Sequence, residues 1–170
     1  MERRRSMQEI LGLLKVRIVR GTNLAFRDTR GSDPYVVLRL GSQKLKTSVK
    51  KRNVNPEWNE DLTLSISNPI MPMKIEVYDK DTFSRDDAMG DAELDIQPYL
   101  DAMKMVWDGI PDGALLKSIE PSSDNCLAAE SSIVYKNKKV VQEAILRLRN
   151  VESGEVEIQM QWVKITSSWY

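Results

Sequence analysis

Apolar and polar residues alternate along several short segments of this chain, as they do in strands that bury one face. Leu14, Val16 and Ile18, for example, alternate with Lys15 and Arg17. The same alternation recurs at residues 35–40, 44–49, 61–66, 73–77, 92–96, 141–148 and 155–162. Turn-forming Gly, Asn and Pro residues separate these segments. The pattern predicts an all-β fold, an eight-stranded antiparallel β-sandwich whose two sheets bury their inner faces against each other.

One connection is much longer than the others. Residues 97–140 lie between the sixth and the seventh predicted strands. Pro98 is placed to begin a helix with Tyr99 and Met103 on one face, and a hairpin is expected around residues 136–139. A connection of this length in a compact sandwich is usually functional or structured in its own right. We therefore expect an insertion that contains a helix and a hairpin.

Length and composition exclude several classes of function. The 170 residues suffice for one domain, which we place at residues 11–170 behind a basic tail at residues 1–10. The 25 basic and 25 acidic residues leave no net charge, so bulk charge favours neither nucleic acid nor membrane. Histidine is absent, which removes the usual general base, most zinc sites and any Ser-His-Asp triad.

The sequence also carries an expectation about location. The single cysteine, Cys126, cannot form an internal disulfide, which favours a reducing compartment. The N-terminal residues lack the pattern of a signal peptide, and no stretch approaches the roughly 18 apolar residues that span a bilayer. We expect a cytoplasmic protein that associates reversibly with membrane, at its periphery.

Acidic residues are concentrated in two predicted loops. Asp79 and Asp81 continue the inward phase of the strand at residues 73–77, and Asp87 returns from the far side of the same loop. The loop RDTRGSDPY adds Asp28 and Asp33. If the two loops are neighbours at one end of the sandwich, five carboxylates converge there.

This set of ligands favours calcium. Calcium takes six to eight oxygen ligands in flexible geometry, whereas magnesium prefers a strict octahedron and zinc prefers His or Cys. Asp is also common in ordinary turns, so a single Asp-x-Asp would indicate little. Two loops that match in this way indicate a calcium site with Asp28, Asp33, Asp79, Asp81 and Asp87 as ligands.

The motifs SDPYV, NPEWNE, VYDKD and MGDAEL resemble those of the C2 domain, a calcium-dependent membrane-targeting sandwich. The resemblance implies two or three calcium ions held by the five aspartates, with backbone carbonyls near Arg27 and Lys80 completing the shell. It also implies the permuted topology of the fold, because the chain begins directly with LLKVRIVRG and ends with an extra strand, MQWVKI.

Further motifs narrow the resemblance. QKLKTSV, DDAMGDAELDI, NCLAAESS and LRLRNVESGEVEIQMQWV are similar to small plant proteins with one C2 domain that are related to abscisic acid signalling, a group that includes proteins described as GTPase-activating. The resemblance implies binding to anionic phospholipid at the plasma membrane and recruitment of PYR/PYL-type abscisic acid receptors. GTPase activation comes with the family, and presence in the nucleus stays open.

Two groups of residues are candidates for lipid contact. Phe83 and Arg85 lie in the loop DTFSRDD, where the phenyl ring could insert and the guanidinium could meet phosphate. Arg39, Lys44 and Lys46 lie on a strand pair that forms a basic phosphoinositide patch in C2 domains. Packing within the loop is the alternative for Phe83, and protection of strand edges is the alternative for the lysines. We expect Phe26 to pack beneath its own loop.

Three classes of function follow from these observations. The first is a calcium-switched phospholipid-binding adaptor, which the acidic loops favour. The second is a protein-interaction module that acts mainly through residues 97–140, for example as a GTPase regulator, with calcium secondary. The third is an enzyme using paired carboxylates, which the absence of histidine and of an evident apolar cleft disfavours. We therefore expect no catalytic residues and no nucleic-acid partner.

Overall fold

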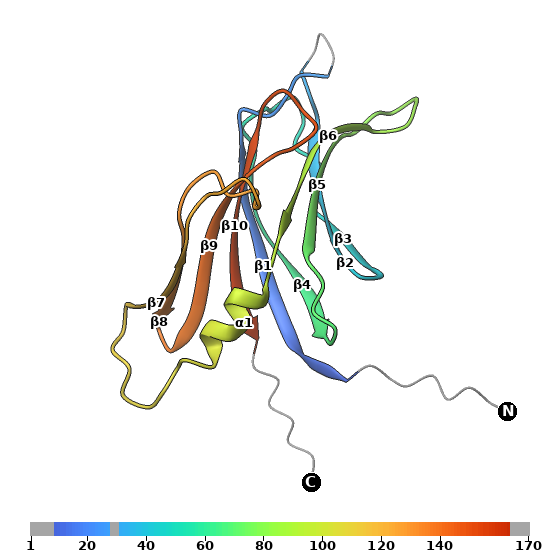
Figure 1. The fold of residues 1–170 in the computed structure, drawn as a ribbon. Helices are drawn as coiled ribbons and strands as arrows, with labels where there is room; N and C mark the ends of the chain where they lie inside the picture. The colour runs from blue at the N-terminus through green and yellow to red at the C-terminus, as the bar shows by residue number, and fades with distance from the viewer. Residues whose placement is uncertain (1–8, 28–30, 164–170) are drawn as a thin grey trace, which may run out of the picture.

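The computed structural model describes residues 9–27 and 31–163. These residues form two antiparallel sheets that pack face to face, with one short helix at one end (Figure 1). In chain order the elements are β1 (Ile10–Thr22), β2 (Pro34–Leu40), β3 (Gln43–Lys46), β4 (Glu57–Ser67), β5 (Met73–Asp79), β6 (Asp87–Leu94), α1 (Gln97–Met103), β7 (Ala114–Ile119), β8 (Ser131–Lys136), β9 (Lys139–Arg147) and β10 (Glu155–Val163). The prediction of an all-β antiparallel sandwich is confirmed.

The larger sheet has the order β4-β1-β10-β9-β8-β7, and the smaller sheet has the order β3-β2-β5-β6. The inward phases read from the sequence are buried in one core, as Val16 in β1, Ile75 in β5 and Ile158 in β10 illustrate, each with no exposed surface. The first and last strands are neighbours, with Val16 opposite Met160. The close approach of these strands depends on Gly12, because a Cβ there would lie 2.1 Å from the ring of Trp162.

The expected number of eight strands is too low, because the described residues form ten. The two additional strands, β7 and β8, lie in the insertion and extend the larger sheet. Strand β7 is short and its register shifts between Leu115 and Lys117, and Leu116 on its inner face is only half-buried, so its sequence gives a weaker signal than the other strands. The predicted hairpin is confirmed: Asn137 and Lys138 have φ of 51° and 62°, as a two-residue turn between β8 and β9 requires.

The predicted helix is also present as α1, with Pro98 in its first turn. Tyr99, fully buried, donates a hydrogen bond from its hydroxyl to the Val140 carbonyl at 2.8 Å and accepts one from the Trp162 N–H at 2.7 Å. Strands β9 and β10 pair as far as Val141 and Gln161, so this hydroxyl connects the two strands where they begin to separate. Burial raises the pKa of Tyr99 to about 12, which keeps the hydroxyl protonated. No helix among the described residues is long and apolar enough to cross a bilayer.

Strand β6 contains a bulge that the sequence pattern did not predict. Glu76 pairs with Asp91 and Tyr78 with Ala88, so Met89 and Gly90 together oppose one residue of β5. Gly90 has a φ of 98°, which favours glycine. One extra residue reverses the alternation of a strand. The residues of β6 before the bulge therefore face the side of the sheet opposite to the one that uninterrupted alternation predicts. Strand β6 accordingly begins at residue 87, five residues before the predicted start.

The bulge also lies against the other sheet. A Cβ at Gly90 would lie 2.5 Å from Cγ1 of Val151 and 2.9 Å from the carbonyl oxygen of Arg149. The next residue, Asp91, exchanges two backbone hydrogen bonds with Arg149, at 2.7 and 3.1 Å. Its carboxylate accepts further hydrogen bonds from the Arg149 guanidinium at 2.7 Å and the Asn150 amide at 2.8 Å. These contacts join β6 to the connection between β9 and β10.

The Asp91 carboxylate should therefore stabilise the fold in a pH-dependent way. Burial opposes ionisation, but the hydrogen bonds from Asn150 and Arg149 outweigh it and hold the pKa of Asp91 below its usual value. The stabilisation is present above the unfolded pKa, about 4, and is lost as pH falls through the lower folded pKa. We expect Asp91→Asn to lower the free energy of unfolding by about 1 kcal/mol at pH 7, because the ion pair is partly exposed.

Urea unfolding at pH 7 and at pH 3 measures this effect, with Asp124→Asn, an exposed change, as the control. The difference between wild type and Asp91→Asn should shrink toward pH 3. An equal difference at both values would show that the carboxylate charge does not stabilise this contact.

Candidate functional site

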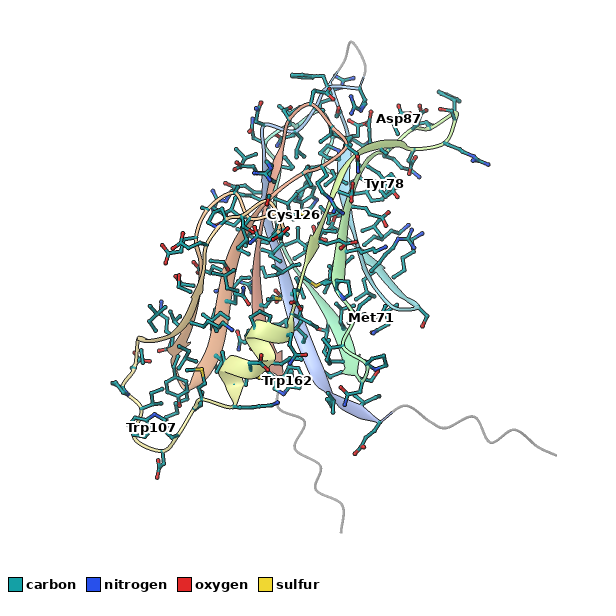
Figure 2. All side chains as sticks on the ribbon, in the orientation of Figure 1. Met71, Tyr78, Asp87, Trp107, Cys126 and Trp162 are labelled. Carbon is teal, nitrogen blue, oxygen red and sulfur yellow. The ribbon has the colours of Figure 1, made fainter. Side chains whose placement is uncertain are left out.

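Three of the five predicted carboxylates lie at the ends of adjacent strands of the smaller sheet. Asp33 immediately precedes β2, Asp79 ends β5 and Asp87 begins β6. Pro34 pairs with Asp79, and Asp79 pairs with Asp87. Figure 2 shows Asp87 at the end of the sandwich away from α1 and Trp162. The fold therefore brings these residues together, whereas Asp28 lies outside the described residues.

The bulge in β6 places Asp87 on the same face as Asp79. The inward residues Leu94 and Ala92 continue through the bulge to Met89, which is fully buried, and then to Asp87. Without the extra residue, Asp87 would face outward and Ala88 would take the inward position. The pairing of Asp79 with Asp87 thus sets two carboxylates directly across from each other, an arrangement that destabilises a sheet unless a cation offsets it.

Hydrogen bonds connect the two loops. The Asp33 N–H donates to Oδ1 of Asp79 at 2.8 Å, and the Lys80 N–H donates to the Asp33 carbonyl at 2.9 Å. Oδ1 of Asp33 accepts from the N–H of Arg52 at 2.8 Å. Asp79 is 5% exposed, so its carboxylate lies at the base of the group.

The loop between β5 and β6 is organised by Asp81 and Asp86. Asp81 accepts hydrogen bonds from the Phe83 N–H at 3.0 Å and the Ser84 hydroxyl at 2.7 Å, and these hold its pKa below the usual value. Asp86 accepts from the Asp81 N–H at 2.9 Å and from the Tyr35 hydroxyl, and the pKa of Asp86 is lowered for these reasons. Asp86 is half-buried, and its two hydrogen bonds hold this loop in place.

The donor chemistry of the site fits calcium. Asp33, Asp79, Asp81 and Asp87 offer only oxygen, as calcium requires. No three carboxylates of residues 9–27 and 31–163 are grouped to hold a metal ion as they stand. This agrees with the hydrogen bonds that occupy these carboxylates: Asp33 accepts from Arg52 in the β3–β4 connection, and Asp81 accepts from Phe83 in its own loop. These residues can supply the oxygen ligands. Asp33 and Asp81 would have to give up their present hydrogen bonds to coordinate an ion.

Arg27 and its neighbours organise the first loop in a way that the sequence pattern did not reveal. The Arg27 N–H donates to the Ser32 hydroxyl at 3.0 Å, and that hydroxyl donates to the Ala25 carbonyl at 2.8 Å. The Arg27 guanidinium reaches the Ala88 carbonyl at 3.1 Å and Glu152 at 2.9 Å. Arg27 therefore links the first loop to β6 and to the β9–β10 connection. Ser32 lies within the motif SDPYV and Glu152 within the motif LRLRNVESGEVEIQMQWV, but neither motif indicates these contacts.

Exposed apolar side chains flank the acidic residues. Phe83 is 98% exposed in the β5–β6 loop, and the neighbouring Arg85 is exposed. The expectation that Phe26 packs beneath its loop is wrong, because this side chain is 65% exposed. Both loops thus present a phenyl ring to solvent.

The basic residues of the smaller sheet are only partly available. Lys44 and Lys46 are exposed on β3, and Arg39 on β2 pairs with Lys44 across the sheet. The Arg39 guanidinium, however, donates to Glu76 at 2.6 Å, and the Tyr78 hydroxyl donates to the same carboxylate. Among the residues that the structure describes, Lys44 and Lys46 at the sheet edge form no ion pair, whereas Arg39 does.

Comparisons with known proteins agree with this fold. A structure of the two C2 domains of Extended-Synaptotagmin 2, described as calcium bound, aligns with a TM-score of 0.62 and 21% identity, over 92% of this chain and 47% of that one. This likeness concerns the fold.

Two curated relatives match over nearly their full length. One is "Protein C2-DOMAIN ABA-RELATED 3" of Arabidopsis thaliana, 55% identical over 95% of this chain and 96% of its own. The other is "GTPase activating protein 1" of Oryza sativa subsp. indica, 57% identical over 94% of this chain and 96% of its own. The family model of the C2 domain, a binding module rather than a catalytic one, matches residues 12–108. The chain therefore belongs to the C2 domain family, within the group of plant single-C2 proteins that includes these two relatives.

Proposed function

We propose that this protein is a calcium-dependent phospholipid-binding adaptor that docks on anionic membranes through the loops flanking β2, β5 and β6. The observation that carries the proposal is the direct opposition of Asp79 and Asp87, with Asp33 and Asp81 beside them. Asp28, in the same loop as Asp33, is the proposed fifth ligand. The carbonyls of Arg27 and Lys80 are proposed to complete the shell.

Electrostatics support a switch at this end of the molecule. Four described carboxylates concentrate negative charge that repels an acidic lipid surface. Two or three bound calcium ions would supply opposite charge and open coordination positions for lipid phosphate. Hydrogen bonds from Phe83 and Ser84 lower the pKa of Asp81, so this carboxylate also stays charged in mildly acidic solution.

The loop side chains are suited to the lipid that the acidic residues would meet. Phe83 and Phe26 can bury apolar surface between the lipid head groups. Arg85 can contact lipid phosphate, and its attraction to an anionic surface contributes about 1 kcal/mol to binding. Lys44 and Lys46 on β3 offer a second contact for phosphorylated head groups. Arg39 forms an ion pair with Glu76. We therefore propose that Arg39 holds Glu76 in place and does not contact lipid.

The names of the relatives support a role in signalling. We propose that the membrane-bound protein recruits a partner such as a PYR/PYL-type abscisic acid receptor or a GTPase. The insertion is the proposed contact surface, because Met105, Trp107 and Leu115 are each more than half exposed there. The proposed location is the cytoplasm and the periphery of the plasma membrane, with the nucleus as an alternative.

The calcium ligands can be tested by Asp79→Asn combined with Asp81→Asn. These changes keep the side-chain volumes but remove two charges, so the calcium concentration for half-maximal sedimentation with phosphatidylserine vesicles should rise by at least about tenfold. Asp108→Asn with Asp124→Asn makes the same charge change at exposed sites in the insertion and should leave sedimentation unchanged. Unchanged sedimentation of the first variant would refute the ligand assignment.

The role of the loop tip can be tested separately. Phe83→Ser should weaken vesicle binding at saturating calcium by about three- to tenfold, because a partly inserted ring loses its apolar contact. Calcium binding without lipid, measured by calorimetry, should not change. Met71→Ser removes another exposed apolar side chain, which Figure 2 places far from Asp87, and serves as the control. Equal effects of both substitutions would contradict insertion of Phe83.

Partner recruitment can be tested on calcium-loaded vesicles with a purified PYR/PYL-type receptor or a GTPase. Trp107→Ser combined with Leu115→Ser should reduce capture of the partner by at least about fivefold, since exposed aromatic anchors dominate many interfaces. Binding of the C2 protein to the vesicles should not change. Ile10→Ser with Met71→Ser provides exposed apolar substitutions outside the insertion. If both pairs behave alike, the insertion is not the recruiting surface.

A further inference from the structure

A pocket of about 550 Å³ lies at the end of the sandwich away from the acidic loops. It lies where β9 and β10 begin to separate, next to Val140 and Trp162, the two residues that the Tyr99 hydroxyl connects. Met103 from α1 and Val106 after it line the pocket together with Val140 and Trp162. Its volume falls within the range of small-molecule sites, roughly 300–1,000 Å³.

The rim of this pocket is basic. Lys15 of β1, Lys138 and Lys139 of the β8–β9 hairpin are among the lining residues, and none of the ten lining residues is acidic. Within the described chain, none of these three lysines forms an ion pair. The Lys15 charge acts on Asp61 of β4, whereas Lys138 and Lys139 bring two further positive charges to the rim. A basic rim beside an apolar hollow complements a ligand that has an anionic group and an apolar body.

The hairpin that supplies two of these lysines is held in a defined conformation. Its two central residues adopt the left-handed backbone of a tight two-residue turn. The Asn137 N–H at its tip donates to the Asp112 carboxylate at 2.7 Å. The positions of Lys138 and Lys139 are therefore set by the backbone before any ligand arrives.

The shape of the site distinguishes a single amphiphile from a bilayer. A surface that docks on a bilayer presents protruding apolar side chains, as Phe83 does at the opposite end. Met103, Val106 and Trp162 are instead half-buried and pack against the core. A recessed apolar wall can receive one chain from solution but cannot insert into a membrane.

We propose that this pocket binds a free single-chain anionic amphiphile, with the chain against Met103, Val106 and Trp162 and the carboxylate or phosphate near Lys138, Lys139 and Lys15. This site is separate from the proposed calcium site and does not depend on it. Its occupancy should therefore persist in the presence of a calcium chelator.

The test uses dodecyl phosphate below its micelle concentration, with chelator present, measured by calorimetry and by the indole N–H resonance of Trp162. One saturable site should appear, and that resonance should shift. Inorganic phosphate lacks the chain, and dodecyltrimethylammonium lacks the negative charge, so each should bind at least about tenfold more weakly. Absence of saturable binding, or equal binding of the anionic and cationic amphiphiles, would overturn the proposal.

Two matched variants test the location. Lys138→Glu with Lys139→Glu should weaken dodecyl phosphate binding by at least about tenfold, because two attractive charges become repulsive. Lys44→Glu with Lys46→Glu makes the same charge change on the other sheet and should have no effect. Equal losses in the two variants would overturn the assigned site. A third result would also overturn it: binding to anionic vesicles without calcium that is lost only in the Lys138→Glu, Lys139→Glu variant. The ligand of the site would then be a bilayer.

Discussion

The contact between the β6 bulge and the β9–β10 connection constrains the whole of one end of the molecule. Gly90 can approach Arg149 and Val151 only because it lacks a Cβ, and Asp91 then exchanges backbone hydrogen bonds with Arg149. The same bulge reverses the phase of β6 and turns Asp87 toward Asp79. One extra residue thus ties the two sheets together and brings together the acidic residues that we propose as calcium ligands.

Charge is segregated across the outer face of the smaller sheet, although the chain has no net charge. Lys44 and Lys46 occupy the β3 edge, while Asp91 and Glu93 lie on β6 at the other edge. The strands between them carry an ion pair, in which Arg39 contacts Glu76. Lys74 of β5 also lies 3.9 Å from Glu93 of β6. Because the basic residues of the central strands have these acidic partners, the sheet has a basic edge rather than a basic face. A phosphate ligand of this sheet would therefore be expected at β3.

The sequence predicted those features that follow from local periodicity. The inward phase of β5 extends correctly to Asp79, and the turn at Asn137 lies in the hairpin that was expected around residues 136–139. The bulge at Gly90 was missed, because a glycine among acidic residues resembles a loop. Strand β7 was missed for a different reason: it is short, its register with β8 shifts between Leu115 and Lys117, and its inward side chains are only half-buried.

Long-range contacts account for the remaining errors at the site. Nothing near Phe26 in the sequence indicates that this ring is exposed, and nothing near Arg39 indicates that Glu76 neutralises it, because both outcomes depend on distant strands. The grouping of Asp33, Asp79 and Asp87 was predictable since each ends or begins an adjacent strand.

The length of the sandwich has an electrostatic consequence. Strand β1 runs for 13 residues, from the side of the lysine-rimmed pocket to the side of the acidic loops, and so spans about 40 Å. Ionic screening in the cell acts over about 8 Å, which is several times shorter. A cation arriving at one extremity therefore leaves the potential at the other almost untouched. Communication between the extremities would require mechanical transmission through the strands, and without it the two proposed binding sites would act independently of each other.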